Sequence, residues 1–417
     1  QTAPDFLPTA TFDDVQVVAH QIPLVYLVTT WAGSAALIVQ GETVTPVLLD
    51  GFTEDDLNTL LLERNDAGEA IGGYLVGQLA NPRRLIGQVN PLLGTLGTTL
   101  IAPIADVLRG SGQDTNGKPN IALIPAGDLA LLPLHAAHYP VPNSHNDEMT
   151  SLMDEFTVHY APSARSLARS LEQSTRPQVQ KLTGIGNPRP LDGQPNFSCL
   201  PYAKAELEEI CELLPSEQTS ALYGQEATQS QLLANLPGTT LLHLSCHGTF
   251  NPEEPLDSGL QLADGLLSLR TLLDPAFTGL DNTRLVTLSA CQTAIADFIN
   301  VPNEVIGLPA GFLQAGVPGV VGTLWPVEDR ATSLLMRCFY DNYLNAEMEP
   351  AQALRDAQLW LRDVTRWELG EYYESFIPRL SPEDAEVYAQ NMFLKGDMNE
   401  RPYADPYYWA GFMFHGV

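Results

Sequence analysis

The sequence has few basic residues. Lys and Arg together number 21 of 417 residues, against 50 Asp and Glu, and the formal net charge is −29. A surface with this balance repels the phosphate backbones of nucleic acids, so direct nucleic-acid binding is not expected. The same field would attract basic polypeptide segments, although many proteins carry excess acidic charge simply to stay in solution.

Cysteine is scarce as well, and its spacing is irregular. The chain lacks a basic region and a long apolar run in its first twenty residues, so we expect no secretory signal peptide. The chain starts at Gln1 without a methionine, which leaves a longer precursor open. An odd, scattered set of cysteines does not form a disulfide framework, and it favours a reducing, cytoplasmic location. The five are Cys199, Cys211, Cys246, Cys291 and Cys338.

Charge is missing altogether from Val305 to Val327, a length that could span a membrane. The segment contains five glycines together with Pro309 and Pro318, which would break a single helix exposed to lipid. We therefore predict a buried helix over 306–315, a turn and a buried strand over 319–325, and no membrane span.

The rest of the chain divides into two parts. With 417 residues, 44% of them hydrophobic, the chain can form two or three domain-sized units. The polar, proline-bearing stretch 172–180 predicts the boundary between them, giving parts 1–175 and 176–417. In the first part the pattern predicts strands over 24–28, 35–39, 45–49 and 120–125, and helices over 55–64 and 94–108.

The second part alternates strands and helices, and no internal repeat is evident. This alternation predicts an α/β fold with a parallel sheet covered by helices. In such sheets the reactive groups collect at the carboxyl ends of the strands. The expected strands are 182–185, 219–223, 240–246, 284–290 and 319–325, and the expected helices are 202–214, 228–234, 304–315 and 331–344.

Two of these strand ends carry reactive side chains. The run Leu241-Leu-His-Leu-Ser-Cys-His247-Gly248 places an imidazole where the buried strand ends, which suits a general base. The run Leu285-Val-Thr-Leu-Ser-Ala-Cys291 places a thiol at a second strand end, and a neighbouring histidine can take the proton of such a thiol. Alone, each residue is more often structural, but a histidine followed by a cysteine 44 residues later has the order and approximate spacing of caspases.

These strings resemble the CHAT family of caspase-like peptidases, relatives of separase. The resemblance covers the chain from about residue 20, through LIPAGDLALLPLHAA (123–137), HLSCHGTFNPEEPLDSGLQLADG (243–265), LVTLSACQTA (285–294) and YYWAGFMFHG (407–416). It implies a caspase-like, mainly parallel sheet flanked by helices, with residues 1–175 forming a degenerate caspase-like companion domain and 176–417 the catalytic one.

The resemblance also implies a mechanism. His247 and Cys291 match the family's catalytic dyad, so we expect a cysteine endopeptidase that forms a thioester with its protein or peptide substrate. The backbone N–H groups of Gly248 and Cys291 would stabilise the oxyanion. The caspase signature is only partly kept, because Ser289 and Thr293 stand at its ends.

Specificity is open between two interpretations. In relatives such as separase, an acidic residue in the segment resembling 324–329 lines the pocket for a basic substrate residue, and Asp329 matches it best, beside Glu328. Alternatively, both acids simply begin the helix 331–344. No Lys or Arg lies between Arg284 and Arg330, so an enzyme that requires a basic residue could not cut itself there. Regulation by a partner protein or an attached sensor or helical-repeat domain is then expected.

Several other candidates are weaker. His243 is expected to be a buried structural histidine, and Cys246 to point away from His247. A zinc site from these residues would need ligands on both faces of one strand, so no metal or other cofactor is expected. The Gly184–Pro188 segment is treated as a turn because a phosphate loop would need further glycines and a lysine. A catalytically silent caspase-like interaction module and a nucleotide-binding α/β protein remain as alternatives.

Overall fold

The computed structural model describes most of the chain. The described residues are 11–66, 68–80, 82–110, 118–142, 144, 148–175, 179–249, 251, 254–274, 276–289, 307–376, 386 and 397–417.

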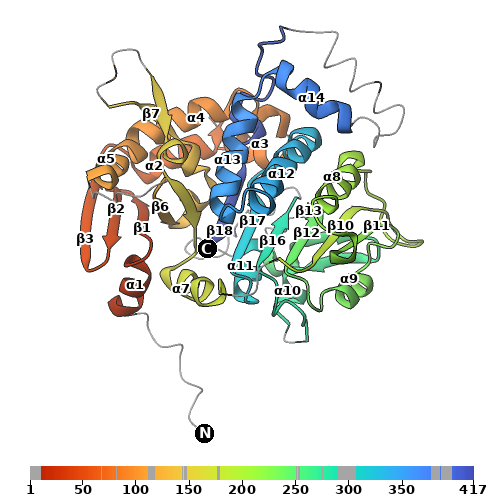
Figure 1. The fold of residues 1–417 in the computed structure, drawn as a ribbon. Helices are drawn as coiled ribbons and strands as arrows, with labels where there is room; N and C mark the ends of the chain where they lie inside the picture. The colour runs from red at the N-terminus through yellow and green to blue at the C-terminus, as the bar shows by residue number, and fades with distance from the viewer. Residues whose placement is uncertain are drawn as a thin grey trace.

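An 11-stranded sheet runs through the molecule in the order β11-β10-β12-β16-β17-β18-β9-β6-β1-β2-β3 (Figure 1). The α/β fold class expected from the sequence is confirmed, because most neighbouring strands are parallel and helices flank the sheet. The strands are β1 (Leu24–Thr30), β2 (Gly33–Gln40), β3 (Thr43–Leu49), β6 (Asn120–Pro125), β9 (Thr157–Tyr160), β10 (Leu182–Pro188), β11 (Thr219–Gly224), β12 (Leu241–Ser245), β16 (Leu285–Leu288), β17 (Gly319–Thr323) and β18 (Phe412–Gly416).

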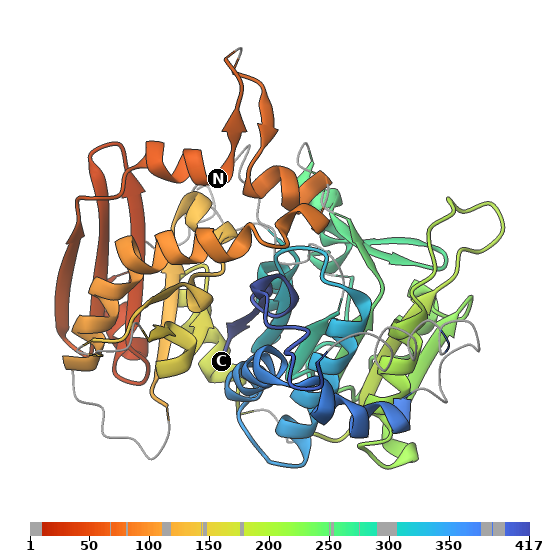
Figure 2. The ribbon, with the colours of Figure 1, turned by 90° about the horizontal axis from the view of Figure 1, so that it is seen from above.

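The sheet has two halves that run in opposite directions. Strands β11, β10, β12, β16 and β17 are parallel to one another, and β18, β9, β6 and β1 are parallel in the other direction. The change of direction falls between β17 and β18, which are antiparallel. The carboxyl ends of the strands in one half therefore point the opposite way from those in the other half. Figure 2 shows the two halves side by side.

Helices cover the sheet on both faces. In the second half, α8 and α12 pack on one face, and α9 and α11 on the other. In the first half, α2, α4 and α5 pack on one face, and α1 and α7 on the other. The helices are α1 (Phe12–Ala19), α2 (Glu54–Leu61), α3 (Tyr74–Ala80), α4 (Val89–Leu96), α5 (Ala102–Gly110), α6 (Leu152–Glu155), α7 (Ala164–Gln173), α8 (Pro201–Cys211), α9 (Gln229–Asn235), α10 (Leu269–Leu272), α11 (Leu308–Gln314), α12 (Asp329–Leu344), α13 (Pro350–Asp363) and α14 (Arg366–Phe376).

Three small sheets lie outside the main sheet. Strands β13 (His247–Thr249), β14 (Gly259–Leu262) and β15 (Gly265–Ser268) form an antiparallel sheet directly after β12. Two hairpins pair β4 (Glu63–Arg64) with β5 (Ala70–Gly72), and β7 (His138–Pro140) with β8 (Met149–Ser151).

Most of the elements expected from the sequence are present, with differences at their ends. The helix expected over 55–64 ends at Leu61, because Glu63 and Arg64 pair with the strand Ala70–Gly72 instead. The segment 184–188 was treated as a turn, and that is wrong: β10 continues to Pro188, with Asn187 at a positive φ of 49°. The uncharged segment contains a largely buried helix, α11, and a fully buried strand, β17, as expected.

The helical stretch Val89–Gly110 is long and apolar enough to cross a membrane by length and composition alone. Half of its most apolar window is buried inside the protein, including Leu93, Leu100 and Ile104 in the main core. Core helices pass the same test, so this stretch is weak evidence for a membrane span. The helix expected over 94–108 is interrupted by a π-helical turn at Gly97–Ile101.

Candidate active site

The candidate general base lies where the connections of two neighbouring strands diverge. Strands β10 and β12 are adjacent and parallel, but the chain leaves β10 toward β11 on one side and β12 toward β16 on the other. Such a point opens a crevice at the carboxyl ends of the strands, where α/β proteins bind their ligands. His247 follows β12 at this point and begins β13.

The imidazole of His247 is held by the loop that follows β10. Its Nε2 atom lies 2.9 Å from the carbonyl oxygen of Ser198 and 3.2 Å from the hydroxyl oxygen of the same residue. The ring of Phe197 meets the imidazole edge to face, with the ring centres 5.7 Å apart. Because a carbonyl oxygen can only accept a hydrogen bond, this contact assigns the proton of the neutral ring to Nε2 and leaves the lone pair on Nδ1.

The loop carrying Ser198 is itself tied to the end of β10. The side chain of Asn187 accepts a hydrogen bond from the backbone N–H of Leu200 at 2.9 Å. It also donates to the sulfur of Cys199 at 3.3 Å, and Arg189 donates to the same sulfur at 2.7 Å. Sequence analysis missed these residues. The pairing of Asn187 with Cys199 spans a loop, and only the unusual Gly-Asn-Pro at the end of a strand could have pointed to it.

Asp329 lies at the carboxyl end of the same half-sheet, as the first residue of α12. Its carboxylate accepts a hydrogen bond from the backbone of Tyr202 at the start of α8. Loss of solvation raises the pKa of Asp329 to about 7, the nearby negative charges of Glu206 and Glu328 add to the rise, and the hydrogen bond from Tyr202 opposes it. The segment 198–202 thus contacts His247 at one end and Asp329 at the other.

Glu328 occupies the N-cap position of α12 and makes no capping hydrogen bond with its side chain. Its side chain is exposed, whereas that of Asp329 is only partly accessible. Both acids therefore begin the helix, as the structural interpretation expects, and this placement does not exclude a role in a substrate pocket. The oxyanion candidate Gly248 lies beside His247 in β13, opposite Leu260 of β14.

His243 is a buried structural residue, as expected. It is fully inaccessible, with Nε2 2.9 Å from a carboxylate oxygen of Glu206 and Nδ1 3.2 Å from the hydroxyl of Tyr340. Tyr340 donates in turn to the hydroxyl of Thr287 at 2.9 Å. Cys246 is buried in the core formed with α9 and α11, whereas the neighbouring His247 is partly exposed.

The candidate nucleophile Cys291 lies outside the described residues. The strand that precedes it, β16, is adjacent and parallel to β12, with Leu288 opposite Leu244. In the sequence, Cys291 stands as many residues beyond Leu288 as His247 stands beyond Leu244. The last described residue before the gap, Ser289, is buried.

Comparison with solved structures finds similar chains at low identity. Gingipain R, an Arg-specific cysteine proteinase, is 9% identical, with a TM-score of 0.43, over 80% of this chain and 75% of that one. The pro- and mature domains of RgpB from Porphyromonas gingivalis give 8% identity and a TM-score of 0.44, over 80% and 76%. Separase from Saccharomyces cerevisiae, in complex with securin, is 14% identical with a TM-score of 0.38, over 63% and 16%.

Sequence comparison identifies the family. Tetratricopeptide repeat protein 28 of Mus musculus is 24% identical over an alignment of 313 residues, which covers 64% of this chain and 12% of that protein. The same protein of Homo sapiens is 24% identical over an alignment of 325 residues, which covers 67% of this chain and 13% of that protein. The chain therefore spans only about an eighth of these relatives. The family model of the CHAT domain matches residues 90–417, and the chain belongs to the CHAT domain family.

Proposed function

We propose that this protein is a cysteine endopeptidase in which Cys291 is the nucleophile and His247 the general base. The observation that carries the proposal is the placement of His247 at the divergence of β10 and β12, with Nε2 bound to the Ser198 carbonyl. The lone pair on Nδ1 is then available to take a proton. The matching positions of His247 and Cys291 beyond the paired strands β12 and β16 support the same assignment.

The proposed reaction is acyl transfer from a peptide to water. Nδ1 of His247 takes the thiol proton of Cys291, and the thiolate attacks the carbonyl carbon of the substrate. The protonated imidazole donates this proton to the departing amine as the peptide bond breaks, which leaves a thioester. Water then attacks the thioester and regenerates the thiol. The backbone N–H groups of Gly248 and Cys291 stabilise the negative oxygen in both steps.

We further propose that Asp329 selects a basic residue on the amino side of the cleaved bond. Its carboxylate is partly removed from solvent and lies near Glu206 and Glu328, so an arriving Arg or Lys side chain would relieve the repulsion among these charges. The segment 198–202 contacts both His247 and Asp329, which supports a shared site for the dyad and this carboxylate. The preference would be for Arg, whose planar donors match a carboxylate.

A regulatory partner or attached domain forms part of the proposal. The curated relatives are named for tetratricopeptide repeats, and the separase of similar fold was solved bound to securin. Because no basic residue lies between Arg284 and Arg330, an enzyme with basic specificity could not be activated by cutting that segment itself. A cytoplasmic location, where thiols stay reduced, fits a thiol nucleophile.

The test compares single variants on fluorogenic peptides that differ only in the residue before the cleaved bond. Cys291→Ala and His247→Ala should each lower kcat/KM at least about a thousandfold, since nucleophile and base act as a unit. Cys199 is exposed beside Arg189, so labelling with a peptide electrophile is best measured in a Cys199→Ala background. Turnover that persists without Cys291 would refute the proposal, and wild-type protein that neither cleaves a peptide nor is labelled at Cys291 would favour a silent interaction module.

A further inference from the structure

One face of the β1–β3 meander carries exposed hydrophobic residues that the helices of the first half do not cover. Strands β1, β2 and β3 form an antiparallel meander, in which residues directly opposite each other share a face. On the outer face, Leu37 lies between Tyr26 and Pro46, and Ala35 lies between Val28 and Leu48. Val28, Leu37 and Leu48 are 43%, 45% and 72% exposed. We call these six residues, together with Val44, the open face.

The opposite face of the same strands is covered in the usual way. Leu27, Ile38 and Val47 are buried there in the core shared with α2, α4 and α5. On the side of the open face, α1 and α7 pack against β1, β6 and the end of β2, where Leu24 and Val39 are buried. Sheets of α/β proteins are normally covered on both faces. The helical layer formed by α7 and α1 reaches only the end of β2 and leaves the rest of β2 and β3 exposed.

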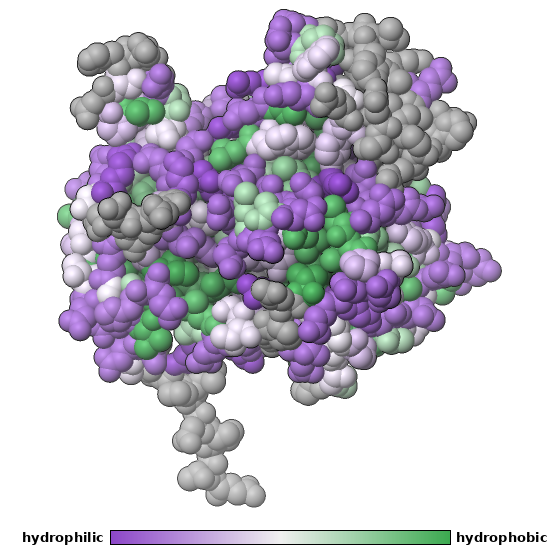
Figure 3. Space-filling model, in the orientation of Figure 1, coloured by the Kyte–Doolittle hydropathy of each residue, from purple (hydrophilic) through white to green (hydrophobic). Residues whose placement is uncertain are grey.

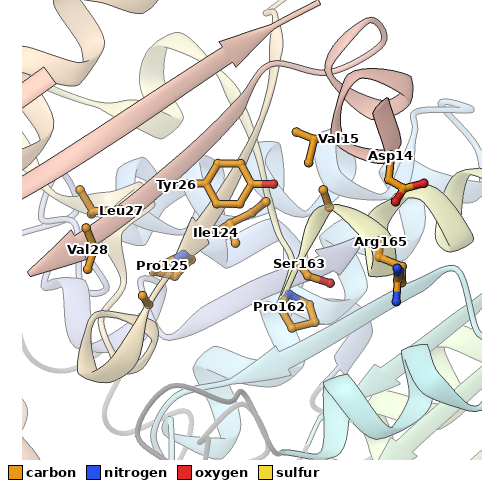
Figure 4. Close-up of a pocket in the computed structure, with 12 residues that line it drawn as sticks. Asp14, Val15, Tyr26, Leu27, Val28, Ile124, Pro125, Pro162, Ser163 and Arg165 are labelled. Carbon is orange, nitrogen blue, oxygen red and sulfur yellow. The ribbon is translucent and has the colours of Figure 1, made fainter. Parts of the chain in front are cut away.

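A cavity continues the open face toward the middle of the sheet. It has a volume of about 490 Å³ and lies where β1 and β6 end, at the point where the chain leaves β1 toward β2 and β6 toward β9. Tyr26, Ile124 and Pro125 lie in its middle, and Asp14 and Arg165 at one end (Figure 4). Figure 3 shows hydrophobic residues at the surface over β1, α1 and α7. The connections that leave β1 and β6 diverge at this cavity, as the connections that leave β10 and β12 diverge beside His247 in the other half.

Acidic residues surround the open face and the cavity. Glu42 lies in the turn between β2 and β3, and Asp50 follows β3 at the opposite end of the meander. Asp13 and Asp14 lie in the first turn of α1, and all four acids are exposed. An occupant with basic residues beside its hydrophobic side chains would complement this edge, in keeping with the net charge of −29.

We propose that the open face is a docking site for an amphipathic helix with basic flanks, supplied by a partner protein. A helix about 10 Å wide covers two strands spaced about 4.8 Å apart, so one helix is enough to cover β2 and β3 beside α1. A hydrophobic side chain of that helix enters the cavity next to Tyr26. This inference does not rest on the proposed peptidase activity, because binding requires neither His247 nor Cys291.

The probe is a fluorescein-labelled helical peptide of about 18 Leu and Lys residues, with Leu at helical spacing. Its binding is measured by fluorescence anisotropy at about 0.15 M salt, using the Cys291→Ala protein so that the peptide cannot be cut. We expect micromolar binding. The double variant Leu37→Thr/Leu48→Thr keeps good strand formers but removes two hydrophobic anchors, and should weaken binding at least about tenfold.

Three comparisons make the result specific. The variant Ile71→Thr changes an aliphatic residue that is 51% exposed on a strand elsewhere, and should leave binding unchanged. A scrambled peptide of the same composition, and a peptide with Glu in place of Lys, should bind at least about tenfold more weakly. The proposal would be overturned if all three peptides bound equally well. It would also be overturned if the Leu37→Thr/Leu48→Thr variant bound the peptide as tightly as the Ile71→Thr variant. Dimerisation that Leu37→Thr/Leu48→Thr abolishes would also overturn it, since a second copy would then occupy the face.

Discussion

Replacing Asp329 with Asn tests the charge at the candidate pocket without removing its hydrogen bond. The Asn side chain can still accept from the Tyr202 backbone, but it cannot ionise. Folding raises the pKa of Asp329 from 3.8 to about 7, so the folded protein holds this proton more tightly than the unfolded chain. The ionised group therefore lowers stability progressively as the pH rises from about 4 to about 7, and the full penalty is present above that range.

The size of the effect follows from the shift in pKa. A change from 3.8 to about 7 corresponds to an upper limit of about 4 kcal/mol, and partial exposure of the side chain reduces the expected value to about 1–2 kcal/mol. Asp329→Asn should thus stabilise the protein by this amount at pH 8 and by almost nothing at pH 4. Urea unfolding at a series of pH values measures it, with the exposed Asp281→Asn as the control. A difference that does not vary with pH would contradict the reasoning.

The same variant tests specificity. In the wild-type enzyme, the ratio of kcat/KM for an Arg peptide to that for a Leu peptide should rise with pH through about 7, as Asp329 ionises. Taking the ratio cancels every pH effect on the chemical steps that is common to both substrates. Asp329→Asn should lower the ratio about 10- to 100-fold and remove its pH dependence. An unchanged ratio would mean that Asp329 does not select the substrate and serves only at the start of α12 and in its hydrogen bond with the start of α8.

Three further outcomes are expected. A methyl group at Gly97 would overlap the carbonyl oxygen of His138, so Gly97→Ala should cost about 1–3 kcal/mol in unfolding measurements, whereas Gly370→Ala, with open space around it, should not destabilise the protein. Cys246→Ala should keep most peptidase activity in the fluorogenic assay, because this thiol is buried away from the crevice; inactivity would reverse the assigned roles. Mass spectrometry of active enzyme should show a chain uncut across 285–329, and a required cut there would refute basic specificity.

The sequence predicts strands such as β12 well because of a general property of parallel sheets. Leu241, Leu242 and Leu244 are buried on both faces of the sheet, so the strand reads as a continuous hydrophobic run that ends where His247 meets solvent. The same pattern predicts β16. Local composition was therefore sufficient to predict the strand before each candidate catalytic residue, whereas the pairing of the two strands comes from the structure.

The support around His247 could not be predicted in this way. Ser198 holds the imidazole from a position 49 residues away, on a loop without hydrophobic periodicity. The loop that carries Ser198 is tied to Asn187, which adopts a positive φ near the end of β10 and accepts a hydrogen bond from the backbone of Leu200. Such contacts depend on how distant loops meet, and short-range patterns do not contain that information.

The position of β18 also depends on contacts between distant parts of the chain. It limits how a partner on the open face could affect the candidate catalytic residues. The carboxyl-terminal strand lies between the two halves, paired with β17 along Gly319–Thr323 and joined to β9 at Tyr160. The open face extends to the carboxyl ends of the strands in the first half. His247 and Asp329 lie at the carboxyl ends of the strands in the second half, which point the opposite way. A helix docked on the open face would therefore not contact the candidate catalytic residues. Its effect on them would have to pass through β9, β18 and β17, since Asp329 begins the helix that follows β17.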